Sequence, residues 1–493
     1  AEALSDSDCC STADLAMRAA LASLLLACCL VAGLRSPPPA TVLRRDALAA
    51  ATAAVAAGSV LPDAAEAAGD RGYSAVLGGP FEFGFPLAAP KRATVRRELV
   101  PGRIWSFEQV QGLIYVHVPV RMTAVKLDAG GLLLYSAVAP TEECLRLLAE
   151  VEATAGAVRH ILLPTVALEH KYFAGAFADA RPDAQLWVAS AQYSFPLDLP
   201  LDLQGFPRGT KRLPDEMAPG RQGGGGAAEG GADASDRPEW AEQLPYKVLG
   251  PIAESVGAFQ EVVLFDRPTG TLLVTDLVVG VPTAPPEVLR VNDDRALRFH
   301  SRDSPAEEAV ATDEARAIGW KKICLFALYF QSSPLAVASP PDGSPAGAVR
   351  FFRSAFPAEV PAEARALGWN GFIAWSWKPD WRDAFEALRG GGSPLVPPII
   401  QVAILNREPR RVLEFVRAVG AEFAFTQIVP CHFDAPVSAT PKEWSEAFNF
   451  LRASPVGGPG ARGDLPAADL AFLRAFEAGL VRAGTIRRAA PRV

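Results

Sequence analysis

Four polar side chains from three distant parts of the sequence have the types that bind a metal ion. Glu169 and His170 follow an apolar strand expected over residues 158–163. Asp276 ends the second strand of an expected hairpin, and His432 follows the strand expected at FAFTQIVP. Loops at strand ends are where functional residues concentrate in layered α/β proteins. Two imidazoles and one or two carboxylates suit Zn²⁺, Fe or Mn²⁺ better than Ca²⁺ or an ion that prefers thiolates.

Taken singly, each of these residues has a simpler interpretation, because many strands end in an Asp or a His. The alternative is a loop side chain held by hydrogen bonds, with no ligand. If one metal ion binds, it can lower the pKa of a bound water to about 7 and polarise a carbonyl or phosphoryl oxygen. Glu169 could instead leave the metal and act as a general base, since it adjoins His170.

The segments before these residues predict a sheet with one capped helix. Residues 104–119 are typical of two strands with a turn near Gly112, and DAGG at 128–131 separates two apolar runs, as in a hairpin. Thr141 can cap a helix that Gly156 ends. Its apolar positions recur at helical spacing, at Cys144, Leu147, Leu148 and Val151.

The second half of the chain mixes strands and helices. FQEVVLF and TLLVTDLVVG flank the turn DRPTG and predict another hairpin. A polar helix is expected around 305–317, a helix from Pro409 to Val419 with its stop at Gly420, and a closing helix at about 441–452. Hairpins followed by mixed units argue for an α/β fold with layered sheets. Periodicity alone does not give the topology.

Composition divides the 493 residues into an extension, a body and a tail. A domain is expected over 75–455, with a flexible Gly-rich insertion at 208–240 and a C-terminal tail at 456–493. The net charge of −7 is mild and no basic stripe with interleaved aromatics is present, which excludes nucleic acid as a favoured partner. The three cysteines of the body are scattered, so neither a disulfide framework nor a CxxC zinc site is indicated.

Residues 1–70 are expected to be a targeting or disordered extension. One positive charge precedes an apolar run at 17–34, as in a signal peptide, and Arg44-Arg45 with an A-x-A site forms a twin-arginine signal over 44–67. Two such signals in series resemble the targeting of proteins sent into a plastid and then into the thylakoid lumen. The alternative is an Ala-rich disordered tail. No other run predicts a stable membrane span in the mature chain.

The order of these pieces resembles the metallo-β-lactamase fold, a four-layer αβ/βα sandwich with two mixed sheets that carries many metal-dependent hydrolases. In that superfamily a strand runs into T-H-x-H-x-D-H-x-x-G. Laid on PTVALEHKYFAG, this motif puts Thr165 and Ala167 at the first two histidines, Glu169 at the aspartate and His170 at the third histidine. LLVTDL resembles the hairpin that ends in a bridging aspartate, and IVPCH resembles the closing P-G-H.

The departures from that pattern all affect the first of the two metal positions of the superfamily. Thr165, Ala167 and Gln260 stand where the first metal position needs histidines, so the resemblance implies that this position is empty. The second position would take the ligands Glu169, His170, Asp276 and His432. Glu is one methylene longer than the usual Asp. The resemblance therefore implies at most one divalent metal, Zn, Fe or Mn, or none.

A closer resemblance is to the domain of unknown function 4336, a family of photosynthetic organisms. It is carried by VPVRMTAVKLDAGGLLLYSAVAPTEECLRLL, LPTVALEHKYFAGAFA, AQLWVASAQYSFPLDLPL, TLLVTDLVVGVP and IVPCHFDAPVSAT, and covers roughly residues 104–452 without the insertion. The resemblance implies a plastid setting and the lactamase-like fold. It implies no known activity.

Two functions remain open at this point. The first is a single-metal hydrolase of an ester, thioester or phosphoester, with Glu169 as the candidate catalytic residue. The second is a non-catalytic binding or scaffold protein for a small molecule, in which Trp375, Trp377 and Trp381, with Phe372, would line an apolar pocket. The alternative for these aromatic residues is core packing.

Overall fold

The computed structural model describes residues 92–113, 115–193, 199–215, 237–255, 257–291, 293–337, 360–367, 371, 373, 375–456, 462 and 464–493. The expected extension at 1–70, with its signals at 17–34 and 44–67, lies outside the described residues. So do Phe372 and the Gly-rich run of the expected insertion. Of the helices in the described part of the chain, none combines the length and the apolar character that a membrane crossing requires.

Seven strands form the first sheet, in the order in which they occur in the chain. They are β1 (Val95–Val100), β2 (Ile104–Leu113), β3 (Val116–Lys126), β4 (Leu132–Tyr135), β5 (Val158–Leu163), β6 (Gln185–Val188) and β7 (Lys211–Arg212). Neighbours are antiparallel from β1 to β4 and parallel from β4 to β7. The expected strand pair at 104–119 and the hairpin at 128–131 are both confirmed. Gly112 lies at the end of β2 with a φ of +149°, as the tight turn requires.

Five strands form the second sheet, in the order β14-β13-β10-β9-β8. They are β8 (Tyr246–Glu254), β9 (Gly257–Asp266), β10 (Thr271–Val274), β13 (Gln427–Pro430) and β14 (Val437–Ser438). The hairpin expected around DRPTG is confirmed as β9 and β10, which are antiparallel. Strand β13 is parallel to β10, although about 150 residues of other structure separate them in the chain. A separate two-stranded sheet joins β11 (Leu335–Val337) and β12 (Trp375–Trp377).

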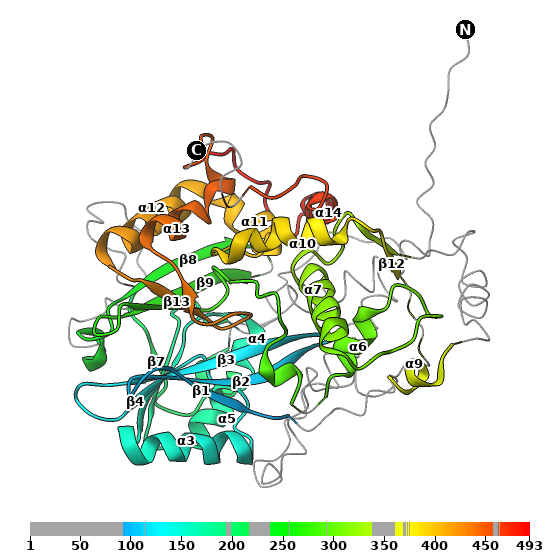
Figure 1. Cartoon of the computed structure of the whole chain (residues 1–493). Coiled ribbons are helices and arrows are strands. Elements are labelled where there is room, and N and C mark those ends of the chain that lie inside the picture. The colour runs from blue at the N-terminus through cyan, green and yellow to red at the C-terminus, as the bar shows by residue number, and fades with distance from the viewer. Residues whose placement is uncertain are drawn as a thin grey trace.

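The two large sheets pack face to face, with helices on both outer sides (Figure 1). In β4, Leu133 and Tyr135 face the core between the sheets, while Leu132 and Leu134 face the layer of α3 (Glu142–Ala155) and α5 (Ala174–Asp179). The second sheet is covered by α11 (Pro398–Ala403), α12 (Pro409–Glu422) and α13 (Pro441–Glu446). This alternation follows from the period of two in a strand. The expected α/β class, a four-layer αβ/βα sandwich with two mixed sheets, is confirmed.

Helix α3 forms where the cap and the apolar spacing predict it. The Oγ1 of Thr141 accepts a hydrogen bond from the backbone N–H of Cys144 at 3.1 Å, and Gly156 is the C-cap. Cys144, Leu148 and Val151 are buried against the first sheet, and the predicted face is therefore the one that packs. The three cysteines of the described body, Cys144, Cys324 and Cys431, are all free and buried.

The predicted end of α12 at Gly420 is wrong. The helix continues to Glu422, and the N–H of Phe423 donates to Val419 O at 3.0 Å. A Cβ at Gly420 would lie 3.5 Å from the Cβ of Pro441, the first residue of α13. The glycine therefore stands where two helices approach each other, and packing outweighs its weak preference for a helix end.

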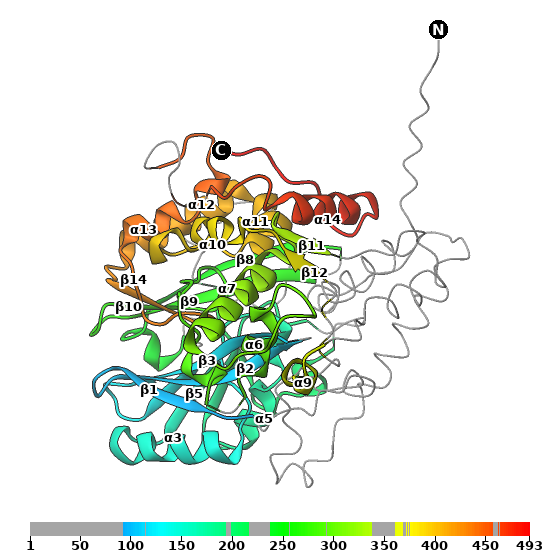
Figure 2. The ribbon, with the colours of Figure 1, turned by 45° about the vertical axis from the view of Figure 1, so that its right-hand side comes forward.

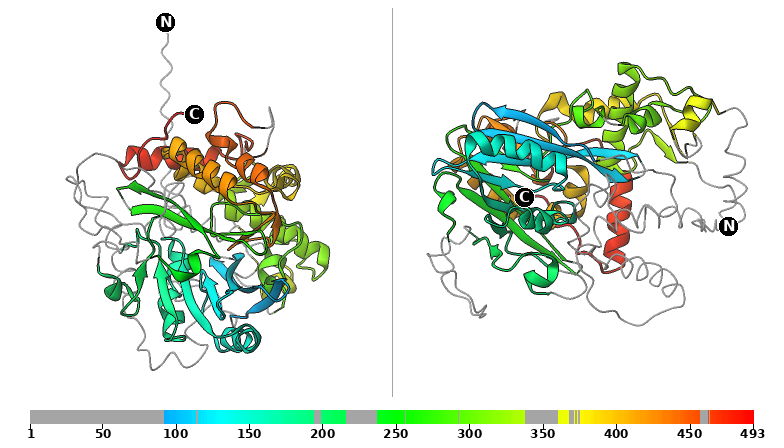
Figure 3. Two further views of the ribbon diagram at one scale, coloured as in Figure 1. Left: turned by 90° about the vertical axis from the view of Figure 1, so that its left-hand side faces the viewer. Right: turned by 90° about the horizontal axis from the view of Figure 1, so that it is seen from below.

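A group of helices lies at one side of the sandwich (Figure 2). In the view from below, this group is separated from α3 (Figure 3, right). It includes α6 (Arg295–Ser301), α7 (Asp313–Tyr329), α9 (Ala362–Ala366) and α10 (Trp381–Arg389). The polar helix predicted at 305–317 is wrong, because α7 begins only after Thr312, whose Oγ1 accepts from Ala315 N–H at 3.2 Å. The helix then runs on through the apolar residues that follow. Packing against β3 and α10 decides its position, and its own polarity does not.

Both expected boundaries of the domain need correction. The insertion expected at 208–240 includes β7, and its Leu213 and Trp240 are buried in the core between the sheets. The tail expected at 456–493 contains α14 (Ala471–Arg482), whose Leu473 is fully buried. Arg407, with a side chain closed to solvent, forms an ion pair with Glu477 of α14 at 2.7 Å. These segments are ordered because the few apolar side chains within their polar sequence are buried against the rest of the domain.

Candidate metal centre

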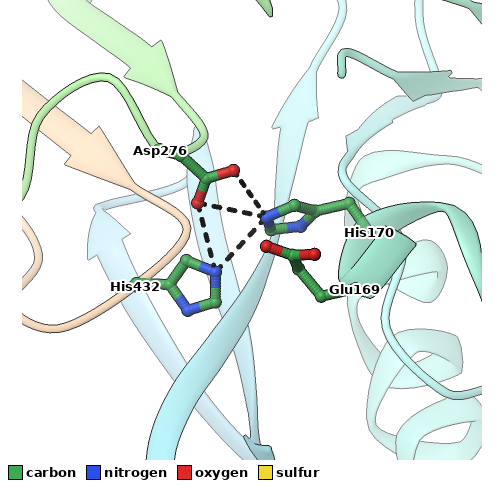
Figure 4. Close-up of side chains that lie close together, drawn as sticks. All are labelled: Glu169, His170, Asp276 and His432. Atoms are coloured by element: carbon green, nitrogen blue, oxygen red, sulfur yellow. Dashed lines mark hydrogen bonds and ion pairs between the residues drawn. The ribbon is translucent and has the colours of Figure 1, made fainter. Parts of the chain in front are cut away.

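The structure brings the four expected ligands together (Figure 4). One ligand atom from each of Glu169, His170, Asp276 and His432 lies within 4.8 Å of every other. His170 is fully buried, and the side chains of Asp276 and His432 are each 12 % exposed. No other group of three or more such side chains is present in the part of the chain that the structure describes.

Sheet register explains why residues so far apart in sequence meet here. In the parallel pair of β10 and β13, Val274 lies opposite Pro430, and both strands end at these residues. Asp276 and His432 each lie two residues farther on, so their loops leave the sheet side by side. The first sheet supplies the other two ligands from α4 (Leu168–Lys171), a single turn just after β5. The site therefore lies where the ends of strands from both sheets face each other.

Both histidines direct Nε2 into the site, because Nδ1 is held from behind. Nδ1 of His432 donates to the carbonyl oxygen of Pro119 at 2.9 Å. A carbonyl oxygen only accepts, so Nε2 of neutral His432 carries a lone pair. Nδ1 of His170 forms a hydrogen bond of 2.7 Å with Oγ of Ser136. A hydroxyl both donates and accepts, so Ser136 is compatible with His170 whether its Nε2 carries a proton or a lone pair.

The separations inside the cluster match those of ligands around one small ion. Nε2 of His170 lies 3.3 Å from Nε2 of His432, and each imidazole lies 3.3–3.5 Å from an oxygen of Asp276. Ligand bonds of about 2.0–2.1 Å in tetrahedral geometry place neighbouring ligand atoms roughly 3.3–3.4 Å apart. Lone pairs held this close repel unless a positive charge lies between them. The residues present therefore fit a single divalent metal.

The pKa values of the two histidines move in opposite directions. Burial lowers the pKa of His170, but the charge of Asp276 and the hydrogen bond to it outweigh burial, and the pKa is raised overall. Burial lowers the pKa of His432 to about 4, partly offset by Asp276. In the metal-free protein, a proton on His170 supplies the positive charge that the cluster requires. A metal ion would displace that proton.

The two carboxylates of the cluster also differ. Burial acts to raise the pKa of Asp276, but His170 and His432 outweigh it, so the pKa is lowered and the group stays ionised. Burial, and then the charge of Asp276, raise the pKa of Glu169. Glu169 is the less buried of the two neighbours on α4, and its carboxylate is turned toward the other three ligands (Figure 4). It is the carboxylate of the cluster best suited to exchange a proton.

A buried residue that sequence reasoning missed, Glu261, holds the loop of Asp276. Its carboxylate accepts the backbone N–H groups of Thr275 at 2.7 Å, Asp276 at 2.9 Å and Leu277 at 3.1 Å. Burial and the charge of Asp276 raise the pKa of Glu261 to about 7. A carboxylate within the apolar run FQEVVLF was the available signal, because a buried acid needs a specific partner.

A second missed residue, Arg121, holds the loop of His432. Its guanidinium donates to the carbonyl oxygens of Pro430 and Phe433, which flank His432 on both sides, the latter at 2.7 Å. Its charge is balanced by Glu108 on the neighbouring strand, at 2.9 Å, and both side chains are 1 % exposed. The signal was again a charged residue inside an apolar strand, here VPVRMTAV.

The residues at the expected first metal position are engaged elsewhere. Oγ1 of Thr165 accepts from the backbone N–H of Ala167 at 3.2 Å. Gln260 is turned to the loop after β6, where its amide oxygen accepts from Ala191 N–H at 2.7 Å and its amide nitrogen donates to Ser190 Oγ. The described ligands thus form one group, at the second position.

The aromatic residues expected to line a pocket are packed into a hydrophobic core instead. Trp375 stacks on His300 with ring centroids 5.5 Å apart and planes at 19°. Trp377 and Trp381 are buried in the same core as α7, and Lys322 lies over the ring of Trp381. The observed contacts favour the core-packing interpretation.

Two backbone conformations next to the centre are unusual. Ser136, which holds His170, has a φ of +60°, and Phe433, which follows His432, has a φ of +56°. Residues other than glycine adopt this left-handed region at a cost of order 1 kcal/mol or more, and such residues cluster at functional sites. Ser136 contacts a ligand of the centre and Phe433 follows one in the sequence, which supports a functional role for this part of the fold.

Comparison with known proteins gives a family and a general likeness of fold. The family model described as Domain of unknown function (DUF4336) matches residues 101–450. A metallo-β-lactamase from Pontibacter korlensis is 14 % identical, with 47 % of this chain and 83 % of that chain covered and a TM-score of 0.25. The metallo-β-lactamase FIM-1 from Pseudomonas aeruginosa in its mono-zinc form is 11 % identical, with 48 % and 81 % covered and a TM-score of 0.26. A putative diflavin flavoprotein from Nostoc sp. is 10 % identical, with 38 % and 67 % covered and a TM-score of 0.25. Among curated proteins there is no match.

Proposed function

This chain belongs to the DUF4336 family, and we propose that it is a hydrolase that holds one divalent metal ion and cleaves an ester, thioester or phosphoester. The observation that carries the proposal is the spacing of the ligand atoms of His170, Asp276 and His432, 3.3–3.5 Å from one another, with Nδ1 of both imidazoles bonded behind. Loss of the proton from His170 would leave lone pairs of all three residues directed at one point, which is the arrangement that binds an ion.

The residues divide the work between binding and proton transfer. His170, Asp276 and His432 would hold the ion, and the mixed nitrogen and oxygen donors suit Zn²⁺, Fe or Mn²⁺. A bound divalent ion would acidify water and polarise the carbonyl or phosphoryl oxygen of a substrate. Glu169 adjoins His170, and its raised pKa brings the carboxylate closer to the range in which it can accept a proton from water and return it to the leaving group.

Metal content and hydrolysis together test the proposal. Purified protein is expected to contain about one equivalent of metal by elemental analysis, and Asp276→Ala is expected to lose it. Glu169→Gln is expected to keep most of the metal but to lose about 100-fold or more in the hydrolysis of p-nitrophenyl acetate, a thioester or bis-p-nitrophenyl phosphate. Metal content near zero that His170→Ala leaves unchanged would end the hydrolase proposal.

A second candidate is a non-catalytic binding protein on the same fold. The engagement of Thr165 and Gln260 in local hydrogen bonds supports it, because the first metal position then contributes no ligand. Full metal content together with equal, background-level hydrolysis by the wild type and Glu169→Gln would favour this candidate.

We also propose that the protein is a plastid protein of the thylakoid lumen, on the strength of the signals at 17–34 and 44–67 and the twin arginine at 44–45. Fractionated plastids are then expected to hold it in the soluble lumen, shortened to begin near Ala68. Full-length protein in the cytosol would contradict the proposal.

A further inference from the structure

A groove of about 730 Å³ lies on the outer helical layer, away from the metal centre. Its walls are α12 and α13, together with Arg452, which follows the short turn after α13. The volume falls in the range of small-molecule sites, roughly 300–1,000 Å³. Leu413, Val416 and Pro441 give it an apolar lining.

The charged side chains of the groove are mostly positive, in a chain whose net charge is −7. Arg410, Arg417, Lys442 and Arg452 line it, against Glu414 and the terminal carboxylate of Val493. Lys442 lies 3.7 Å from Glu446. Within the described part of the chain, neither Arg410 nor Arg417 forms an ion pair, although Glu414 lies between them on α12. The arginines of the groove therefore outnumber its anionic groups.

Arg417 and Arg452 oppose each other in this groove. Burial, and then the charge of Arg417, lower the pKa of Arg452. The Nη2 of Arg452 donates to Ser445 Oγ at 2.9 Å, but its Nε is closed to solvent and has no hydrogen-bond partner among the residues that the structure describes. An unpaired buried donor beside a like charge is costly. An anion between the two guanidinium groups would remove the repulsion between them.

We propose that the groove binds a phosphate monoester with an apolar body, the phosphate between Arg417 and Arg452 and the body on the wall of α12. A phosphate monoester carries about −1.5 to −2 charge at pH 7 and accepts the paired N–H groups of arginine. Two arginines can each bind different oxygens of one phosphate, which suits a phosphate better than a single carboxylate. The apolar wall suits an alkyl or aryl body better than inorganic phosphate.

Binding to the full chain by calorimetry tests the proposal, with octyl phosphate as the probe. Octyl phosphate is expected to bind at least about tenfold more tightly than either 1-octanol or pyrophosphate, because only it uses both the charge and the apolar wall. Arg417→Gln and Arg452→Gln are each expected to weaken it about tenfold. Arg146→Gln, which removes an exposed arginine on α3, serves as the matched control and is expected to change nothing.

Three outcomes would overturn the proposal. These are equal affinity for octanol and octyl phosphate, equal affinity for pyrophosphate and octyl phosphate, and unchanged affinity in Arg417→Gln that melts at the wild-type temperature. Asp276→Ala separates this site from the metal centre, because it is expected to leave octyl phosphate affinity at the wild-type value. Loss of metal with retained octyl phosphate binding therefore supports two independent sites.

Discussion

The metal centre and the groove between α12 and α13 are both suited to a charged ligand, the centre to a cation and the groove to an anion. In the centre, three ligand atoms converge, and the residues that carry them are held in place by Ser136, Pro119 and Glu261. In the groove, arginines line an apolar wall and two of them have no ion-pair partner among the described residues. The contrast shows two ways to prepare a site. In the first, hydrogen bonds fix each ligand atom in place. In the second, arginines without ion-pair partners lie beside an apolar wall whose burial by a ligand would be favourable.

The largest expected effect comes from removing the charge behind the centre. Arg121→Met leaves buried Glu108 with only the partly exposed Arg97, at 3.7 Å, and frees the loop of His432. We therefore expect the free energy of unfolding to fall by about 3 kcal/mol in urea titrations. Arg146→Met breaks an exposed pair and is expected to cost under about 1 kcal/mol. An equal, small loss in both variants would show that Arg121 does not support the centre.

Removing a hydroxyl behind one ligand sharpens the comparison. Ser136→Ala deletes the partner of His170 Nδ1, and we expect metal affinity to fall about 10–100-fold, since groups behind a ligand have effects of this size. The φ of +60° is equally unfavourable for Ala and Ser, so backbone strain does not change. Ser190→Ala, at the hydrogen bond to Gln260, is the control, and comparable loss in both would contradict the role of Ser136.

Stability of the metal-free protein should depend on pH through its buried titratable groups. The pKa of His170 is raised on folding, so its protonated form stabilises the fold below pH 6.5, and this contribution is lost as pH rises through the folded value. The pKa of Glu261 is raised to about 7, which acts in the same direction. The lowered pKa values of His117, His300 and His432 act in the opposite direction, so the contribution of Glu261 is measured as a difference between variants. Between pH 6 and pH 9, the melting temperature of the metal-free wild type is expected to fall more, or rise less, than that of Glu261→Gln.

Zinc should reduce this dependence, because the ion replaces the proton on His170 while Glu261 still titrates. The measurement is a melting curve with and without zinc at each pH. An equal change of melting temperature between pH 6 and pH 9 in the metal-free wild type and in Glu261→Gln would contradict the protonation scheme.

Ionic strength is expected to have the smallest effect and to separate the two sites. Raising NaCl from about 0.05 to about 0.5 M should weaken octyl phosphate binding a few-fold, because the arginines of the groove are open to solvent and screened. Metal affinity should change less, because the ligands of the centre are largely closed to water. A larger effect of salt on metal affinity than on octyl phosphate affinity would contradict this comparison of the two sites.

The sequence predicted the parts of the site that depend on local order. Strand ends, the hairpins and the cap at Thr141 are local features, and they led to Glu169, His170, Asp276 and His432. Glu261 and Arg121 could not be assigned in this way, because their roles depend on which loops the two sheets bring against them. A buried charge in an apolar strand signals that a partner exists without identifying it.

Boundaries were predicted less well, for a related reason. Gly420 continues a helix because Pro441 approaches it, and α14 packs because Arg407 and an apolar face of the domain contact it. Both depend on contacts between residues distant in sequence. Strand pairing also depends on distant contacts, since the composition of β10 and of β13 does not predict that the two strands pair in parallel.

The parallel pairing of β10 with β13 also determines when, during synthesis of the chain, the four ligands can come together. His170 and His432 are 262 positions apart, and the strand that delivers His432 can pair only after the intervening helices have emerged from the ribosome. A nascent chain halted before β13 would carry Glu169, His170 and Asp276 but no closed coordination shell. The proposed ion would therefore meet its full set of ligands only after translation has passed this strand, in the compartment where the chain completes its folding.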